Sequence, residues 1–471
     1  MFGLDIGYTL LLLCCLLAAC LFEFINGFHD TANAVATVIY THSLKPTVAV
    51  IWSGFWNFIG VNVGGIAVAI GIINLLPSEV LMDNNLSHSI AMVFALIVTA
   101  IIWNLATWYI GIPCSSSHTL IGSIFGEGIA FMLLPGSTSV ALNWSKVMEV
   151  GLSLLISPIF GFGLAMLLMM LLRKLIKNKQ IFKEPAAKKP PPIWIRSILI
   201  FTSTALSYAH GSNDGQKGVG LIMLILIAFS PTFFAVDRTQ KPEDLFSQTK
   251  TIEWTLRKID VVKLSKSDQN IYSGILLKID SIKLILKGKT QFEQLAKGDH
   301  FNLRKDILFV SKKTEGLLKE YHGKALPNLP LIEQSLMRSN LKKFRGTTEY
   351  APRWVILVVS LSLGLGTMIG WKRIVVTIGE KIGKSHLTYA QGASANLVAA
   401  STIVVSSWFG MPVSTTHVLS SGIAGTMVAG GGRQNLHIKM VQNIGIAWLI
   451  TLPVTMVLSG GLFLLLRWIM H

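Results

Sequence analysis

Long apolar stretches dominate the chain and limit what it can fold into. Hydrophobic residues make up 51% of the 471 positions and charged residues 14%, and the mean hydropathy is +0.57. A soluble fold of this length needs more polar surface than that. About 20 helical residues cross a bilayer, so the sequence predicts an all-α polytopic membrane protein. The candidate spans lie near 9–25, 46–73, 90–111, 147–172, 194–229, 352–371, 389–409 and 439–466.

The net charge of +17 does not indicate a nucleic-acid partner, because the basic residues are not gathered on one folded face with aromatic residues among them. They lie in loops between apolar stretches, which is typical of positive-inside topology. The cysteines lack paired metal-ligand spacing, so neither a metal centre nor a cofactor is expected. The basic residues form two clusters, Arg173, Lys174, Lys177, Lys179, Lys183, Lys188 and Lys189 in the first and Lys372, Arg373, Lys381 and Lys384 in the second.

Two acidic residues, Asp30 and Asp214, interrupt apolar sequence and share a Gly-x-x-Asp core 184 residues apart. A charge at the centre of a spanning helix costs roughly 2.5–3.5 kcal/mol, so such an acid faces a partner or a cavity. Asn26 and Asn33 are spaced with Asp30 at i, i+4 and i+7, on one face of a helix. A broken helix with polar caps accounts for one of these residues but not for all three, which favours a functional site.

A second motif occurs at 111–120 and again at 410–419, 299 residues further on, with Gly, Pro, Ser, His and Leu in register. Proline suits the first turn of a helix, where serine hydroxyls, free N–H groups and the helix dipole together bind anions. Alone, either copy would suggest an ordinary helix cap, but duplication favours an anion site. Its candidate residues are Ser115, Ser116, Ser117, Ser414, Thr415 and Thr416.

The spacing of the motifs also locates an insertion. The distance from Asp30 to His118 is 88 residues, whereas Asp214 and His417 are 203 residues apart. The additional 115 residues fall where charged residues concentrate, and apolar positions such as Ile279 and Ile282 predict amphipathic helices there. The expected domains are 1–184, a first transmembrane repeat; 185–192, a linker; 193–232, the start of a second repeat; 233–348, a soluble helical insert; and 349–471, the rest of the second repeat.

The repeats indicate a secondary transporter whose site lies near the membrane midplane. If each half crosses an odd number of times, the halves have inverted topology and both basic loops are cytoplasmic. The termini and the insert are then expected outside. Hydroxyl and N–H donors suit a tetrahedral oxyanion, whereas Asp30 and Asp214 would repel it unless they were protonated or held a cation. This requirement predicts coupled symport.

The stretches NGFHDTANAVATVIYT, HGSNDGQKGVG, GIPCSSSHTLIG and GMPVSTTHVLSSG resemble the signatures of the inorganic phosphate transporter (PiT) family, most like its bacterial low-affinity branch. The resemblance covers nearly the whole chain. It implies an inverted-repeat transporter with interrupted helices and helical hairpins, located in the inner membrane as a multi-pass protein. It further implies that phosphate enters with protons, largely as a neutral complex of a divalent metal with hydrogen phosphate, whereas other branches use sodium.

The resemblance also assigns roles to individual residues. Asp30 and Asp214 match the motif aspartates of cation coupling, and the Ser and Thr residues of the two caps match the phosphate-binding hairpins. Asn57 stands where some eukaryotic members carry a glutamate, so their ion stoichiometry does not transfer. The remaining candidates are Asn26, Asn213 and Gln216 for substrate, and Asn33, His210 and Glu23 for the coupling cation.

Several side chains keep two interpretations at this stage. His118 and His417 either shuttle protons or brace the caps. Glu23 is either a second proton site or a structural partner. Lys217 either neutralises Asp214 or contacts phosphate. Whether copies of the chain form a homo-oligomer is left open.

Three alternative functions compete with proton-coupled phosphate transport. Sodium could replace the proton, and another oxyanion such as sulfate could replace phosphate. A membrane-embedded serine hydrolase, with Ser115 or Ser414 as nucleophile, is a remote third alternative. It is disfavoured because both groups are duplicated and no third residue orients either histidine, so no catalytic residue is assigned.

Overall fold

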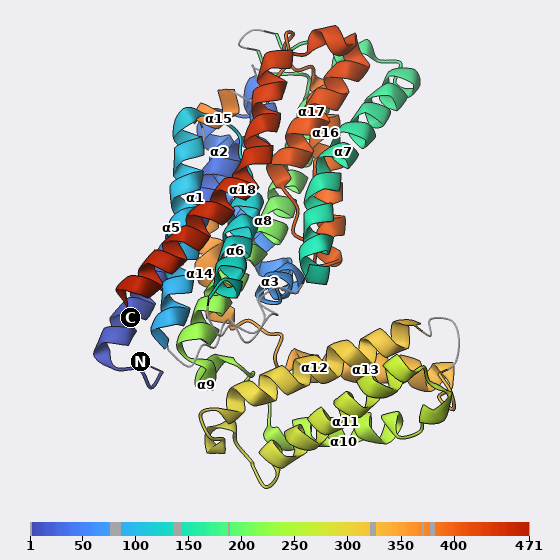
Figure 1. Cartoon of the computed structure of the whole chain (residues 1–471). Coiled ribbons are helices and arrows are strands. Elements are labelled where there is room, and N and C mark those ends of the chain that lie inside the picture. The colour runs from blue at the N-terminus through green and yellow to red at the C-terminus, as the bar shows by residue number, and fades with distance from the viewer. Residues whose placement is uncertain are drawn as a thin grey trace. The chain divides into compact units, whose positions relative to one another are not determined.

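The chain divides into two compact units in a computed structural model. The structure describes residues 2–75, 86–134, 144–186, 189–320, 326–369, 372–376 and 382–470. Within these residues it contains helices and isolated bridges but no strand (Figure 1). The insert unit comprises Met1–Thr9 and Leu226–Tyr350, and the main unit comprises Leu10–Ile225 and Ala351–His471. The predicted 185–192 linker lies partly outside the described residues.

Among the described residues, four helices are long and apolar enough to cross a membrane. A bent pair, in which two helices meet at 72°, raises this number to five if the pair counts as one span. The four helices are α1 (Ile6–Tyr40), α5 (Leu86–Ile110), α7 (Trp144–Leu175) and α18 (Ile438–Ile469), and the bent pair is α2 (Pro46–Val63) with α3 (Ala67–Ile73).

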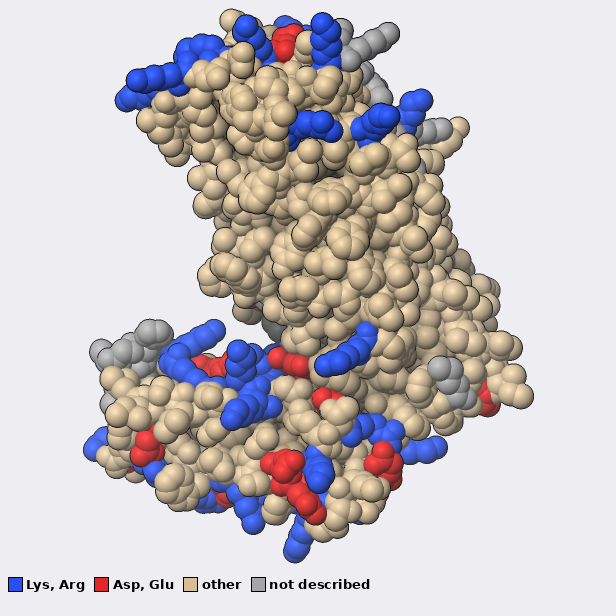
Figure 2. All heavy atoms as spheres, turned by 180° about the vertical axis from the view of Figure 1, so that it is seen from behind, with Lys and Arg blue, Asp and Glu red and all other residues tan. Residues whose placement is uncertain are grey.

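The surface of the main unit suits a lipid environment. Large apolar side chains such as Leu155 and Ile159 on α7 and Leu449 and Val457 on α18 are exposed, which is costly in water and favourable in hydrocarbon. Figure 2 shows a broad band of this unit free of charged side chains on the visible face, with basic residues gathered at the end where α7 stops. The chain is therefore a multi-pass membrane protein.

Duplication is visible in the helices of the main unit. α6 (Ser116–Met132) and α17 (Thr415–Gly431) begin and end 299 residues apart, as the repeated motif predicts. α7 and α18 each have 32 residues and one internal proline. α6 packs mainly on α18 and α17 on α7, so each half supplies a partner to the other. The remaining helices of this unit are α8 (Ile193–Phe229), α14 (Arg353–Thr367), α15 (Lys372–Val376), α16 (Tyr389–Trp408), η1 (Lys179–Phe182) and η5 (Arg433–Asn435).

Paired glycines allow this reciprocal packing. The Cα of Gly126 in α6 lies against the backbone carbonyl of Met456, and Gly425 in α17 lies likewise against that of Phe162. A Cβ atom at either glycine would collide with that carbonyl oxygen. Small residues let helix backbones approach closely in membranes, which explains why these two positions are both glycine in the repeat.

The helices α5 and α6, and likewise α16 and α17, form hairpins that turn inside the main unit. α6 and α17 have 17 residues each, or about 26 Å at 1.5 Å per residue, less than the roughly 30 Å of a bilayer core. The turns place Ser115 and Ser414 in the buried interior. The interruption of α2 and α3 lies at Gly64–Ile66, where Gly65 has a φ of +82°. α1 and α8 run unbroken through their polar motifs.

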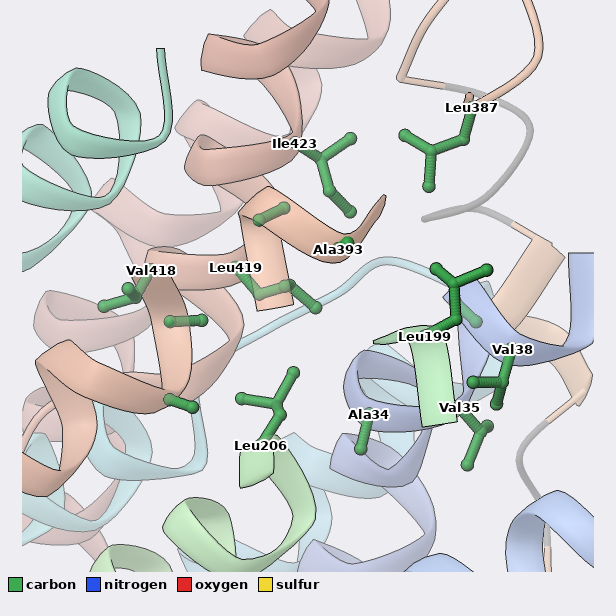
Figure 3. Packing of buried hydrophobic residues seen from close by; sticks show 14 of the residues in the cluster. Ala34, Val35, Val38, Leu199, Leu206, Leu387, Ala393, Val418, Leu419 and Ile423 are labelled. Carbon is green, nitrogen blue, oxygen red and sulfur yellow. The ribbon is translucent and has the colours of Figure 1, made fainter. Parts of the chain in front are cut away.

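An apolar cluster fixes α1, α8, α16 and α17 against one another next to these turns. Val35 and Val38 follow Asp30 on α1 and meet Leu199 of α8, while Leu419 of α17 joins from the second hairpin (Figure 3). All four side chains are fully buried. The polar motifs therefore extend from a rigid apolar support.

The insert unit has its own apolar core, as an independent helical domain would. Ile279 and Ile282 of α11 are buried together with Ile275, which confirms the predicted amphipathic pattern, while Leu277 on the same helix is exposed. Arg304 donates to the carbonyls of Ala235 and Thr348, joining the start and end of the insert. Its helices are α9 (Pro231–Phe234), α10 (Pro242–Leu256), α11 (Lys266–Leu286), α12 (Asp299–Glu320), α13 (Leu331–Gly346), η2 (Val261–Lys263) and η3 (Phe292–Gln294).

Candidate functional site

The two polar motifs lie on helices α1 and α8, which bring Asp30 and Asp214 together in the interior. Because α1 is helical throughout this region, Asn26, Asp30 and Asn33 share one face, as their spacing predicts. All three are buried, and so is Asp214. The sequence could place the two acids on equivalent helices, and the structure adds that they face the same hydroxyl.

That hydroxyl belongs to Ser116, in the first turn of α6. Its Oγ lies 3.2 Å from Asp30 Oδ2 and 3.5 Å from Asp214 Oδ2, so it can donate to either carboxylate. The start of the first hairpin is therefore held between the acids of both halves. Hydroxyls predicted to bind an anion and carboxylates predicted to bind a cation thus occupy one site.

Asp30 is also bound by the second hairpin. Thr416 donates to Asp30 Oδ1 at 2.7 Å, and Asn33 Nδ2 donates to Thr416 Oγ1 at 2.9 Å. Asn33 is 3.4 Å from Asp30 Oδ1 as well. A hydroxyl of the second half therefore completes the surroundings of an acid in the first half.

Asp214 has a different partner, the ammonium of Lys217 one turn later on α8. Lys217 Nζ lies 2.7 Å from Asp214 Oδ1 and 3.1 Å from the Val413 carbonyl oxygen, and it also contacts Ser117 Oγ. Ser117 donates to the same carbonyl at 2.8 Å. Of the two interpretations of Lys217, the structure contains the one in which it neutralises Asp214.

The hairpin starts differ from the prediction in one detail. Ser115 and Ser414 are the N-caps, and their hydroxyls accept from the N–H of His118 and His417. Pro113 lies two residues before its cap, so the prediction that proline occupies the first helical turn is wrong. The serine hydroxyl takes the capping position, and proline fixes the extended approach to it. The first turn is left to the residues next in sequence, Ser116, Ser117, Thr415 and Thr416.

Two histidines contact the acids directly. His29 Nδ1 is 3.2 Å from Asp30 Oδ1. His210 Nε2 lies 3.8 Å from Asp30 Oδ2 and 3.6 Å from Asp214 Oδ2, between the two carboxylates. Asn57 Oδ1, 2.8 Å from His210 Nδ1, orients the ring. Asn57 Nδ2 also donates to Thr367 Oγ1, so it links α2 to α14.

Asp30, His210 and Asp214 form a cluster that sequence spacing did not reveal. One ligand atom from each lies within 4.8 Å of the others, and all three residues are buried. Two carboxylates and an imidazole are suitable ligands for a divalent cation. His210 was predicted from the motif, but its position between the acids depends on how α1 and α8 pack and has no local signal.

Other predicted residues bind protein groups close to these contacts. Asn213 Nδ2 donates to Ser407 Oγ at 2.8 Å, and its Oδ1 accepts from the Val413 N–H at 3.4 Å. Gln216 accepts from the Val68 N–H at 2.8 Å and donates to the Gly64 carbonyl, so it stabilises the break between α2 and α3. In this conformation their side chains position the backbone around the site.

Glu23 lies two turns before Asp30 on α1. Asn26 Nδ2 is 3.4 Å from its Oε2, while its Oε1 has no hydrogen-bond partner among the described residues. Three buried carboxylates, those of Glu23, Asp30 and Asp214, therefore share the region with Lys217, the one Lys or Arg buried in the described part of the main unit. The buried carboxylates outnumber the buried lysine, so added cations would balance their charge.

The chain resembles known transporters over almost its whole length. A model of the phosphate transporter family matches residues 26–459. A low-affinity inorganic phosphate transporter of Buchnera aphidicola (subspecies Acyrthosiphon pisum) is 42% identical, with 98% of this chain and 97% of that one covered. The low-affinity inorganic phosphate transporters PitB and PitA of Escherichia coli K12 are each 41% identical, with the same shares covered.

A solved structure described as a sodium-dependent phosphate transporter has a similar fold. Its TM-score is 0.55 over 98% of this chain and 99% of that chain, at 18% sequence identity. At this identity the likeness concerns the fold alone. It agrees with the helical membrane architecture described above.

Proposed function

Because the chain belongs to the phosphate transporter family, and is thus a transporter rather than an enzyme, we propose that it imports inorganic phosphate by proton symport across the inner membrane. The observation that carries this proposal is the position of Ser116 between Asp30 and Asp214. One hydroxyl cannot donate its single proton to a carboxylate and to a substrate oxyanion at the same time. Anion binding and the state of the acids are therefore linked.

Protonation provides that link. In this conformation Ser116 and Thr416 donate to carboxylate oxygens. A proton on Asp30 removes the negative charge that repels an oxyanion, and it weakens Asp30 as an acceptor. Thr416 then becomes free to donate to phosphate, and Ser116 retains only its longer contact of 3.5 Å with Asp214, which phosphate can displace. The N–H groups at the starts of α6 and α17 add further donors. Substrate release and deprotonation reverse these steps.

Alternating access fits the same geometry. The hydroxyls come from two hairpins, and the acids from two helices in different halves of the sequence. All of these side chains are buried in this conformation, so substrate exchange requires one half to move relative to the other. The inverted relation of the halves is part of this proposal.

The transported species under this proposal is largely a complex of a divalent metal with hydrogen phosphate. Asp30, His210 and Asp214 supply hard oxygen and imidazole ligands beside the hydroxyl donors. A neutral complex also reduces the cost of moving phosphate through the interior. Here the metal is cargo, and the protein needs no resident metal.

The test is uptake of labelled phosphate into proteoliposomes under an imposed pH gradient without sodium. Acidic medium outside should drive accumulation, and collapse of the gradient by a protonophore should abolish it. Uptake that ignores the gradient but follows sodium would replace the proton by sodium. Competition by sulfate at equal concentration tests the substrate, because strong inhibition would contradict selectivity for phosphate.

A further inference from the structure

The two repeats place different residues at one equivalent position beside the acids. The 184-residue offset that relates Asp30 to Asp214 also relates Asn33 to Lys217. The 299-residue offset relates Ser117 to Thr416. The two halves of the site can therefore be compared atom by atom.

Their contacts correspond. Asn33 Nδ2 lies 2.9 Å from Thr416 Oγ1, and that hydroxyl donates to Asp30 Oδ1. Lys217 Nζ contacts Ser117 Oγ and lies 2.7 Å from Asp214 Oδ1. In each half, the residue one turn after the acid binds the matching hydroxyl of the opposite hairpin. The amide of one half is replaced by an ammonium in the other.

The surroundings of that ammonium would also suit a small free cation. Lys217 Nζ contacts a carboxylate oxygen, the Ser117 hydroxyl oxygen and the Val413 carbonyl oxygen. Hard cations take oxygen ligands of these kinds, and transporters bind coupling ions with backbone carbonyls near interrupted helices. Lys217 is 1% exposed, so water does not screen its charge, and water could not take its place as a counter-ion of Asp214.

We propose that Lys217 is a tethered counter-ion that permanently occupies the second of two equivalent cation positions. Asp30 then has the position that takes a mobile cation in each cycle, because none of its contacts with the described residues is with a lysine or arginine. Lys217 thereby sets the number of cations moved with each substrate. This inference rests on the proposed function, since it assumes that cation binding at the acids is coupled to transport.

The decisive variant is Lys217→Asn, which gives the second half the side chain found in the first. We expect phosphate uptake by this variant to require a monovalent metal cation, with sodium as the probe. The stimulation should be about tenfold, within the usual range of coupling between sites. Sodium should also raise the melting temperature of the purified variant. This second readout does not depend on transport.

Two controls accompany this variant. Lys217→Met fills the space without an oxygen ligand, so it should lose uptake and gain no response to sodium. Lys439→Asn removes an exposed lysine on α18 and should behave like the wild type. A folded Lys217→Asn protein that shows no sodium effect on uptake or melting temperature would overturn the proposal. An equal sodium response in Lys217→Met would overturn it as well.

The reciprocal variant, Asn33→Lys, decides the question separately if Lys217→Asn does not fold. A lysine there supplies Asp30 with its own counter-ion, so phosphate should equilibrate across the membrane without accumulating in a pH gradient. Gradient-driven accumulation at the wild-type level in Asn33→Lys would contradict the equivalence of the two positions.

Failure of the wild type to transport phosphate would instead refute the proposed function. The sodium-dependent melting temperature of Lys217→Asn would still test the cation position in that case.

Discussion

His118 and His417, which the 299-residue repeat relates, are in tilted ring contact, with centroids 4.4 Å apart. Trp448 of α18 stacks on the His417 ring, with centroids 3.9 Å apart. His118 Nδ1 also lies 2.9 Å from Ser115 Oγ, the N-cap of its own hairpin helix. The two hairpin starts therefore hold each other through aromatic rings, which favours bracing over proton transfer as the role of these histidines.

Bracing predicts that the shape of residue 417 matters more than its ionisation. His417→Phe keeps an aromatic ring between His118 and Trp448 and should retain uptake with the wild-type pH dependence. His417→Ala removes the stack, and aromatic pairs contribute about 0.5–1.5 kcal/mol beyond area burial, so its melting temperature should fall. Uptake against pH and thermal unfolding of both variants provide the check. Loss of the pH dependence in His417→Phe would restore the proton-shuttle interpretation.

The two acids should respond differently to neutralisation. Asp214→Asn leaves the buried Lys217 ammonium without its carboxylate, and breaking one side of a buried ion pair costs about 3–5 kcal/mol. Asp30→Asn removes a carboxylate that has no lysine or arginine partner in the described part of the chain, and it should destabilise less. Melting temperatures in detergent compare the two variants. Adding Lys217→Met to Asp214→Asn should recover part of the loss, and equal destabilisation by the two single variants would contradict the assignment.

The paired glycines should not tolerate a methyl group. Gly126→Ala and Gly425→Ala each place a Cβ against a carbonyl oxygen of the facing helix, and such overpacking costs about 1–3 kcal/mol. Gly163→Ala on α7 is the matched control, because no atom of another described helix lies within 4 Å of its added Cβ. The fraction of protein that stays monodisperse after heating measures the effect. Similar behaviour of all three variants would mean that close helix packing is not the reason for glycine at positions 126 and 425.

The sequence predicted the repeated elements well because both repeats carry local signals. The Pro-x-Ser-x-x-His pattern gave the starts of α6 and α17, and the Gly-x-x-Asp cores gave the acids. Proline was placed in the first helical turn although it lies two residues before the cap, since sequence alone does not decide where the helix begins. The expectation of interrupted helices was realised at Gly65 and in the hairpin turns, not at the acidic motifs.

The contacts within the site could not be predicted from the sequence, because they depend on how distant helices pack. The offsets relate Asn33 to Lys217, but only the packing of α1 on one hairpin and α8 on the other shows that both bind equivalent hydroxyls. The place of His210 between two carboxylates depends on the same packing. Long-range geometry of this kind leaves no periodicity or spacing in the chain.

The insert unit should lose stability in acid at His300. Burial, followed by the charge of Arg238, lowers the pKa of His300 below its ordinary value of 6.5, and neither ring nitrogen has a partner among the described residues. The unfolded state therefore binds a proton below pH 6.5 that the folded state does not, so stability falls as pH falls through that value.

Hydrogen exchange of α12 peptides in the full chain measures this effect. Protection, corrected for intrinsic rates, should decrease below pH 6.5 in the wild type. His300→Leu should weaken that decrease, whereas His437→Gln, a change at an exposed residue of the main unit, should leave it unchanged. If the loss of protection in acid were the same in His300→Leu as in the wild type, a titratable group other than His300 would be its cause.

The most direct test of proton-coupled transport is the pH inside proteoliposomes when phosphate is added outside, reported by a trapped pH-sensitive dye in sodium-free medium with a neutral exchange buffer. The wild type should acidify the lumen in step with uptake of labelled phosphate. Asp30→Asn should exchange phosphate for phosphate without acidification, because its coupling acid no longer titrates. Phosphate accumulation without acidification in the wild type, or wild-type acidification in Asp30→Asn, would contradict proton symport through Asp30.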